Sequence, residues 1–278
     1  MSGDSSASPP GQPIILSMYL KYANFTTSEY RLQVGNQVKY LIISPGTFDK
    51  DRLSSPLQSL PSLAYGNERN VAEVSRDEVS GNLNIIFSKR ELVGVPFDWY
   101  QTKVDCLDLE NTGQLTDTVF EARLHSILPT TSPFPAIMVA KIATHAWELP
   151  YICRQTEAYE FLEGSGLAPR FLGHIHENGR IMGFLLEKIE GRPAYIRDLR
   201  VCTTALVKLH KLGYLHGNVD RSCFLITDEG AKLVKFARLK ESACTKLMSD
   251  ELMALRASFV CDGEYVGVAS LWGDGDGF

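Results

Sequence analysis

The chain of 278 residues lacks a long apolar run. A helix that crosses a bilayer needs about 20 consecutive, predominantly apolar residues, and no stretch of this sequence approaches that length. The first residues, MSGDSSASPPGQP, also lack the basic segment followed by an apolar one that marks a secretory leader. We therefore expect a cytoplasmic protein with no membrane partner.

The chain also has no paired cysteines and little net charge. Its six cysteines are scattered without a C-x-x-C pair, which favours reduced thiols over a disulfide framework or a zinc site. The formal charge of −5 gives no basic surface for nucleic acid. With 44% hydrophobic residues the chain is rich enough to bury a core, so a globular protein is expected; its oligomeric state is not indicated.

The N-terminal third is predicted to be rich in β-structure. Residues 1–13 contain mainly Ser, Gly and Pro and are predicted to form a disordered tail. Short β-branched runs at 14–20, 38–44 and 83–88 predict strands, within an extension that we place at residues 14–98. The intervening residues 45–70 carry three prolines and predict a long surface excursion.

Strand and helix signals alternate in the rest of the chain, which predicts an α+β fold. A polar segment at 108–115 is expected to be a hairpin tip. Helices are expected at 149–164, 196–212 and 245–257, and strands at 99–107, 119–127, 136–142, 168–176, 181–188, 224–227 and 231–236.

The segment between the expected helix at 196–212 and the expected strand at 224–227 resembles a known catalytic loop. It reads His216-Gly217-Asn218-Val219-Asp220-Arg221-Ser222-Cys223, and the strand pair after it ends in Lys235-Phe236. Protein-kinase-like folds of the aminoglycoside phosphotransferase and choline kinase type carry H-G-D-x-x-x-x-N followed by a strand that ends in Asp-Phe. The stretches APRFLGH and LLEKIEGRPA are similar to fungal members of this superfamily.

This resemblance covers residues 99–238 best, and it implies a two-lobed architecture. Residues 99–188 would form a β-rich small lobe, and residues 189–278 a truncated, helical large lobe. Lys141 takes the place of the lysine that pairs with the nucleotide phosphates. The glutamate that should pair with this lysine falls on Gln155, and Glu157 would substitute only if the helix rotates. The hinge between the lobes is expected near Glu187.

Several positions depart from the family pattern, and each departure removes a separate function. Asn218 stands where the catalytic Asp is expected, and it cannot accept a proton as a carboxylate does. Cys223 replaces the Asn that holds magnesium, and a thiol is a poor ligand for a hard cation. Lys235 replaces the metal-binding Asp, so an ammonium group occupies the metal position. Only Gly113 remains of the phosphate-covering G-x-G-x-x-G loop. We therefore predict no cofactor and no metal.

Three functions follow as hypotheses. The first is a pseudoenzyme that has lost metal-dependent phosphotransfer and binds an anionic small molecule or a partner in the cleft, with Lys141, Glu157, Glu187, Asn218 and Cys223 as binding residues. The second is a metal-free enzyme, a cyclase, isomerase or dehydratase of a biosynthetic pathway, with Lys235, Asp220 and His216 as catalytic groups. The third is a weak small-molecule kinase.

Structural roles for the same residues remain open. His216 would brace the loop, Lys235 would pair with Asp220 or reach solvent, and Cys223 would be either a reactive thiol or a small buried hydrophobe. His174 and His176 alternate on a strand but have no evident third metal ligand.

Overall fold

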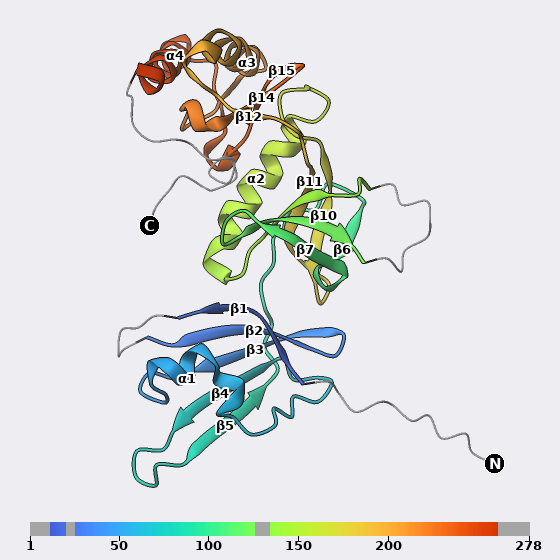
Figure 1. The fold of residues 1–278 in the computed structure, drawn as a ribbon, viewed down its shortest axis with the longest axis vertical. Helices are drawn as coiled ribbons and strands as arrows, with labels where there is room; N and C mark the ends of the chain where they lie inside the picture. Colours follow the sequence, from blue (N-terminus) through green and yellow to red (C-terminus); the bar gives the residue numbers. More distant parts are fainter. Residues whose placement is uncertain (1–11, 21–25, 126–133, 261–278) are drawn as a thin grey trace, which may run out of the picture. The chain divides into compact units, whose positions relative to one another are not determined.

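The computed structural model describes residues 12–20, 26–125 and 134–260. The predicted tail lies almost wholly outside them. The chain divides into two compact units, Met1–Val93 and Gly94–Phe278 (Figure 1). The expected α+β class is confirmed. The finer division at 98/99 and 188/189 stays a prediction. No helix in the described ranges is long and apolar enough to cross a membrane.

The first unit is a five-stranded sheet whose strands follow one another in chain order. They are β1 (Ile14–Tyr19), β2 (Ser28–Val34), β3 (Gln37–Ile43), β4 (Val71–Arg76) and β5 (Leu83–Ser88). β3 and β4 are parallel, whereas the other neighbours are antiparallel. A parallel pair cannot be joined by a tight turn, so the chain crosses over between them through residues 44–70.

Residues 45–70 form the long excursion that the sequence predicts, and most of them are exposed, but several side chains pack against the sheet. The crossover contains α1 (Lys50–Ser54) and the short helix η1 (Pro56–Gln58), and it covers one face of the sheet. Tyr65 is 2% exposed, and its hydroxyl donates to the Tyr40 carbonyl oxygen at 2.8 Å. Tyr30 likewise donates to the carbonyl oxygen of Leu53 at 2.7 Å. The crossover therefore supplies apolar side chains to the core of this unit.

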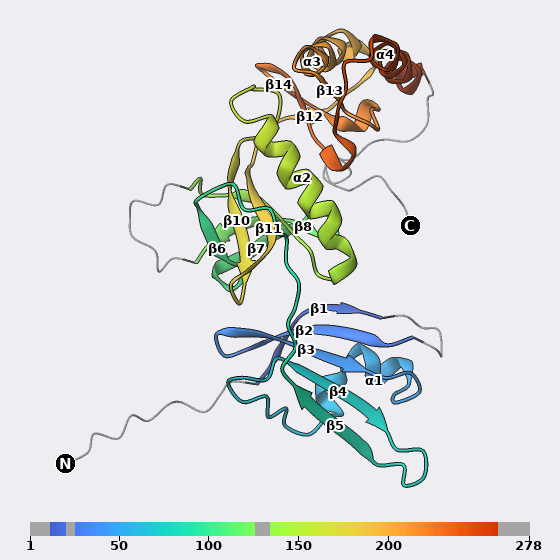
Figure 2. The same ribbon diagram turned by 180° about the vertical axis from the view of Figure 1, so that it is seen from behind.

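The second unit is built on a six-stranded sheet of order β6-β10-β11-β9-β8-β7 (Figure 2). Neighbouring strands in this sheet are antiparallel, except β6 and β10, which are parallel. The helix α2 (Leu149–Phe161) packs on it. The strands are β6 (Lys103–Asp105), β7 (Leu109–Gln114), β8 (Val119–Leu124), β9 (Met138–Ile142), β10 (Phe171–Glu177) and β11 (Arg180–Glu187).

Two predictions in this sheet were wrong in detail. The expected hairpin tip at 108–115 is mostly strand β7, and the turn lies after it, where the amides of Leu115 and Thr116 donate to the Val119 carbonyl oxygen. β7 is polar because it is the last strand of the sheet and its residues Asn111 and Thr112 are exposed. The strand expected at 99–107 is shorter, because a helical turn, η2 (Cys106–Asp108), follows β6.

The remaining elements follow β11, except for one helical turn that precedes α2. The helix α3 (Leu199–Lys211) contacts α4 (Thr245–Val260). A three-stranded sheet contains β12 (Arg192–Pro193), β14 (Phe224–Thr227) and β15 (Gly230–Leu233), and a two-stranded one contains β13 (Tyr214–Leu215) and β16 (Lys240–Glu241). Four helical turns complete this unit: η3 (Ala146–Glu148), η4 (Ile196–Asp198), η5 (Arg221–Cys223) and η6 (Phe236–Arg238).

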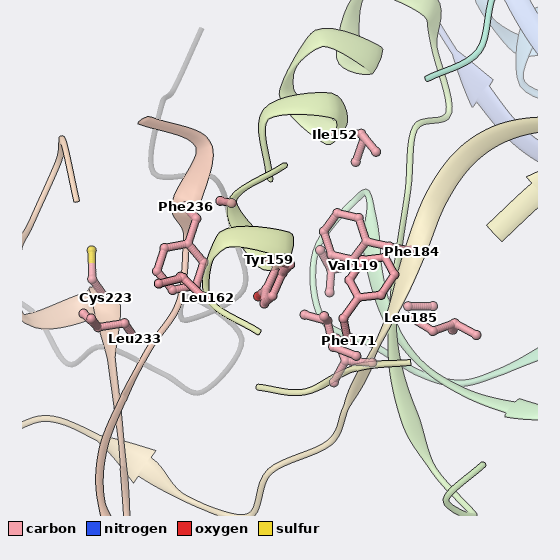
Figure 3. Packing of buried hydrophobic residues seen from close by; sticks show 14 of the residues in the cluster. Val119, Ile152, Tyr159, Leu162, Phe171, Phe184, Leu185, Cys223, Leu233 and Phe236 are labelled. Atoms are coloured by element: carbon pink, nitrogen blue, oxygen red, sulfur yellow. The ribbon is translucent and has the colours of Figure 1, made fainter. Parts of the chain in front are cut away.

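One hydrophobic core runs through the second unit, from the sheet across α2 to α3 and α4. At its centre lies a chain of rings, in which Phe236 faces Tyr159, with Phe184 and Phe171 beyond it (Figure 3). Successive ring centroids from His216 through Phe236, Tyr159 and Phe184 to Phe171 are 5.6, 5.4, 5.5 and 5.8 Å apart. These rings tie the helix and the loop that precedes β14 to the sheet.

Gly183 in β11 has no room for a side chain. A Cβ atom there would lie 2.1 Å from the Lys141 carbonyl oxygen in β9, whereas a Cβ atom on Gly113 would lie no closer than 3.7 Å to its neighbours. We expect Gly183→Ala to lower the free energy of unfolding by about 3 kcal/mol, and Gly113→Ala by less than about 1 kcal/mol. Tryptophan fluorescence in denaturant measures this unit alone, because residues 99, 147 and 272 are the three tryptophans. Equal losses in the two variants would contradict the packing.

Candidate functional site

Lys141 lies in the middle of β9, a strand in which every residue is buried. The side chain is held inside the unit, since the residue is 5% exposed. Its Nζ donates to the Oε1 atom of Gln155 in α2 at 3.1 Å, and Gln155 is itself 4% exposed. Gln155 thus occupies the place assigned to the partner of this lysine, and the contact joins an ammonium to a neutral amide.

The two acidic residues assigned to the cleft lie away from Lys141. Glu157 is two residues beyond Gln155, on the opposite side of the helix, where its Oε1 accepts from the Sγ of Cys153 at 3.4 Å. Glu187 ends β11 and lies 3.7 Å from the Nε of Arg170. The structure therefore brings Lys141 and Gln155 together and leaves Glu157 and Glu187 apart from them.

Lys235 adopts an unusual backbone conformation. Its φ and ψ of 67° and 52° are left-handed, which costs an L-residue about 1–2 kcal/mol. Its Nζ donates to the Oγ of Ser222 at 2.8 Å. An ion pair between Lys235 and Asp220 is absent from the described ranges, so the ammonium is held by a neutral hydroxyl.

His216 is completely buried, and its ring is fixed by one hydrogen bond. Its Nε2 lies 2.9 Å from the Val234 carbonyl oxygen, and because a carbonyl only accepts, Nε2 must carry the proton. Nδ1 has no hydrogen-bond partner in the part of the chain that the structure describes. Burial lowers the pKa of His216, outweighing the opposite influences of the Val234 hydrogen bond, Glu251 and Asp220. The ring is therefore neutral and braces the loop.

The loop after His216 is held by a residue that the sequence did not indicate. Glu251 of α4 accepts from the backbone amides of Gly217 at 2.6 Å and His216 at 3.2 Å, and its Oε2 lies 2.9 Å from the Nε2 of His210. Gly217 has a φ of +86°, and a Cβ atom there would lie 2.0 Å from the Arg238 carbonyl oxygen. The contacts of Glu251 span more than 30 residues, so no local pattern could have identified them.

The remaining loop residues have distinct environments. Asn218 is exposed, whereas the Oδ1 of Asp220 accepts from the Ser222 amide at 2.6 Å and caps η5. Cys223 is 2% exposed, and its Sγ donates to the Asn218 carbonyl oxygen at 3.4 Å. Burial, reinforced by Asp220, raises the pKa of Cys223 to about 12. This thiol is protonated at neutral pH, so it is not a nucleophile.

Lys141 and Lys235 line one small cavity, together with Gln155 and Tyr159. Its volume is about 10 Å³, which is room for about one water molecule. A larger cavity, of about 620 Å³, lies elsewhere in the unit, and of these residues only Tyr159 lines it as well. The larger space is therefore not the place where the two lysines meet.

Within residues 12–20, 26–125 and 134–260, no group of three or more His, Cys, Asp or Glu side chains is arranged to hold a metal ion. His174 is fully buried beside Trp99 and Phe171, and its Nε2 accepts from the Tyr100 amide at 3.3 Å. His176 is partly exposed and lies 3.5 Å from Asp105. The two histidines therefore serve the strand and its packing.

Comparison with known proteins gave no identification: no family model and no curated protein matches the chain. The distinctive feature of the site is two lysines that line one cavity, each of which donates a hydrogen bond to a neutral group.

Glu251 allows a direct test of how the loop is held. We expect Glu251→Gln to lower the free energy of unfolding by about 2 kcal/mol, because the charged acceptor of the two loop amides is lost. Hydrogen exchange at the amides of His216 and Gly217 should accelerate, while the amides within α4 remain protected. The exposed neighbour Asp250 provides the control, and Asp250→Asn should leave both quantities unchanged. Unchanged exchange in Glu251→Gln would contradict the assignment.

Protonation of His216 should destabilise the second unit. The pKa of His216 in the folded state lies below the ordinary value of 6.5. Just below pH 6.5, His216 is therefore protonated in the unfolded chain and neutral in the folded chain. The free energy of unfolding should therefore fall as the pH drops below about 6.5, by up to about 1.4 kcal/mol per pH unit. Burial lowers the pKa of His174 in the same direction.

The test is His216→Gln, which keeps an Nε2 donor but does not titrate. The slope of unfolding free energy against pH, measured by tryptophan fluorescence between pH 5 and 7, should be smaller than in the unmodified protein. Identical slopes would show that His216 does not titrate in this way.

Proposed function

We propose that this chain is a kinase-fold pseudoenzyme that has lost metal-dependent phosphotransfer and acts by binding. The observation that carries the proposal is the position of Lys235, directly before the buried Phe236, with its ammonium bound to Ser222 at 2.8 Å. In kinase-like folds this position holds the metal-binding carboxylate. An ammonium there repels the cation that phosphotransfer requires.

The order of elements in the second unit supports a two-lobed kinase-like architecture. A hairpin (β7 and β8) precedes the lysine strand β9, then come α2, a second hairpin (β10 and β11), α3, the loop with His216, and the pair β14 and β15. This order of elements is the one that the resemblance implies. The contact between Lys141 and Gln155 supports the same alignment, because it joins the strand and the helix that carry the lysine and glutamate of active kinases.

Electrostatics supports the proposed loss of ordinary phosphotransfer. Two unit charges about 4 Å apart interact by roughly 4 kcal/mol at an effective dielectric constant near 20, and a divalent ion doubles this. Replacing a carboxylate by Lys235 turns that attraction into repulsion. Asn218 does not accept a proton, and the buried thiol of Cys223 offers no oxygen ligand. These losses are independent of one another, so repairing one would not restore catalysis.

The site also favours binding over metal-free catalysis. The ring of His216 is buried and neutral, and its Nε2 is engaged by Val234, so it offers a substrate no accessible acid or base. The two ammonium groups around one cavity suit an anionic group of a ligand or of a partner. Because that cavity has room for about one water, binding there requires α2 or the Lys235 side chain to move.

Nucleotide binding tests the proposal. ATP with magnesium should raise the melting temperature of the chain no more than ATP without magnesium, because no carboxylate holds the metal. The matched variant carries Gln155→Glu, Asn218→Asp, Cys223→Asn and Lys235→Asp together, and in it magnesium should add to the stabilisation by ATP. Adding Lys141→Ala to this variant should remove the gain. Magnesium-dependent stabilisation of the unmodified chain would overturn the proposal.

A further inference from the structure

The cavity of about 620 Å³ lies on the second unit, away from the two lysines. Its walls come from the end of α2, the following loop 163–170, the start of β10, the last residue of β11 with residues 188–190 after it, and the turn between β14 and β15. Figure 2 shows the end of α2 and β14 side by side. A volume of this size is typical of a site for a small organic molecule.

Hydrogen bonds between its walls hold the cavity open. The Nζ of Lys232 in β15 donates to the Gly166 carbonyl oxygen at 2.9 Å, and the Leu233 amide donates to the Leu167 carbonyl oxygen at 2.7 Å. On the other side, the Glu187 amide donates to the Arg170 carbonyl oxygen at 2.9 Å. Because the walls are fixed before a ligand arrives, little of the binding free energy is spent on ordering them.

Each basic side chain in the wall already has an acidic partner. Lys188 lies 3.0 Å from Glu121, which is outside the cavity lining. Arg170 lies 3.7 Å from Glu187, and Lys232 lies 3.5 Å from Glu229. The positive charges of the wall are thus taken up by these three carboxylates.

Three further carboxylates in the wall are not neutralised in this way. Glu163 and Asp228 have no ion-pair partner within the described part of the chain. Glu190 lies 4.0 Å from Lys188, but Glu121 lies closer to that lysine, at 3.0 Å. These acids make the wall negative, so it favours a positively charged group. The floor is apolar and includes Tyr159, Leu162 and Phe171.

We propose that this cavity binds a small organic cation, a protonated amine on an apolar body, with the amine toward Glu163 and Asp228 and the body on the floor near Phe171. Aromatic side chains also attract cations. The site is separate from the Lys141 and Lys235 cavity and would take a ligand of opposite charge. The inference therefore goes beyond the proposed function and does not depend on it.

Phenethylamine is a suitable probe, and calorimetric titration of the full chain measures its binding. The matched ligands are 2-phenylethanol, which is neutral, and 3-phenylpropanoate, which is anionic. We expect saturable binding of the amine, binding at least about tenfold weaker for the alcohol, and none for the acid. The paired variant Glu163→Gln/Asp228→Asn should weaken amine binding at least about tenfold, which is the loss expected for a charged hydrogen bond.

Control variants separate the cavity from net charge and from the proposed function. Glu241→Gln/Asp250→Asn removes the same number of exposed acids elsewhere on this unit and should leave amine binding unchanged. Ala168→Phe should abolish binding by filling the cavity, with an unaltered fluorescence unfolding curve. Lys235→Ala should leave amine binding unchanged, so this experiment and the nucleotide experiment can fail separately. The proposal is overturned if the amine does not bind, if the alcohol binds equally well, or if Glu163→Gln/Asp228→Asn binds the amine as before.

Discussion

The burial of Phe236 is the contact on which the candidate site depends. Its ring is fully buried between His216 and Tyr159, which belong to the loop before β14 and to α2. Burying a phenylalanine side chain contributes about 1.5–3 kcal/mol. Holding Lys235 in the left-handed conformation costs about 1–2 kcal/mol. The apolar gain is therefore large enough to offset the backbone strain, and the packing of Phe236 helps to fix where the preceding ammonium lies.

The same packing explains why the polar groups nearby bind one another. The Nε2–H of His216 donates a hydrogen bond to the Val234 carbonyl oxygen, Gln155 accepts from Lys141, and Ser222 accepts from Lys235. Nearly every polar contact of the site is thus made within the protein, and the space left between the two lysines is about 10 Å³. These contacts join the loop before β14 to the turn after β15, and the strand β9 to the helix α2.

Local patterns predicted the second unit well because its elements carry strong periodic signals. The strand around Lys141, the helix from Leu149 and the pair β14 and β15 all fell close to the expected places. Local patterns do not predict polar edge strands. The sequence predicts a hairpin tip in place of β7, because the exposed Asn and Thr residues of this strand show no apolar alternation. In the first unit β2 and β4 were missed, since charged side chains interrupt them.

The candidate site also has a predictable part and an unpredictable part. The contact between Lys141 and Gln155 was predictable, because it follows from the alignment of one strand with one helix. The roles of Ser222 and Glu251 were not, since each depends on a contact between segments that only folding brings together. The large cavity was also beyond prediction, because its walls come from three stretches that are distant in the sequence, 159–171, 187–190 and 227–232.

The parallel pairing of β3 with β4 has a consequence for the order in which the first unit assembles. As the chain leaves the ribosome, the antiparallel meander β1–β2–β3 can form early. The free edge of β3 has no partner strand until β4, which ends at Arg76, has emerged. An uncovered strand edge is a template for unwanted pairing. The crossover that carries Tyr65 is made in that interval, so its early docking would shield the nascent sheet from neighbouring chains.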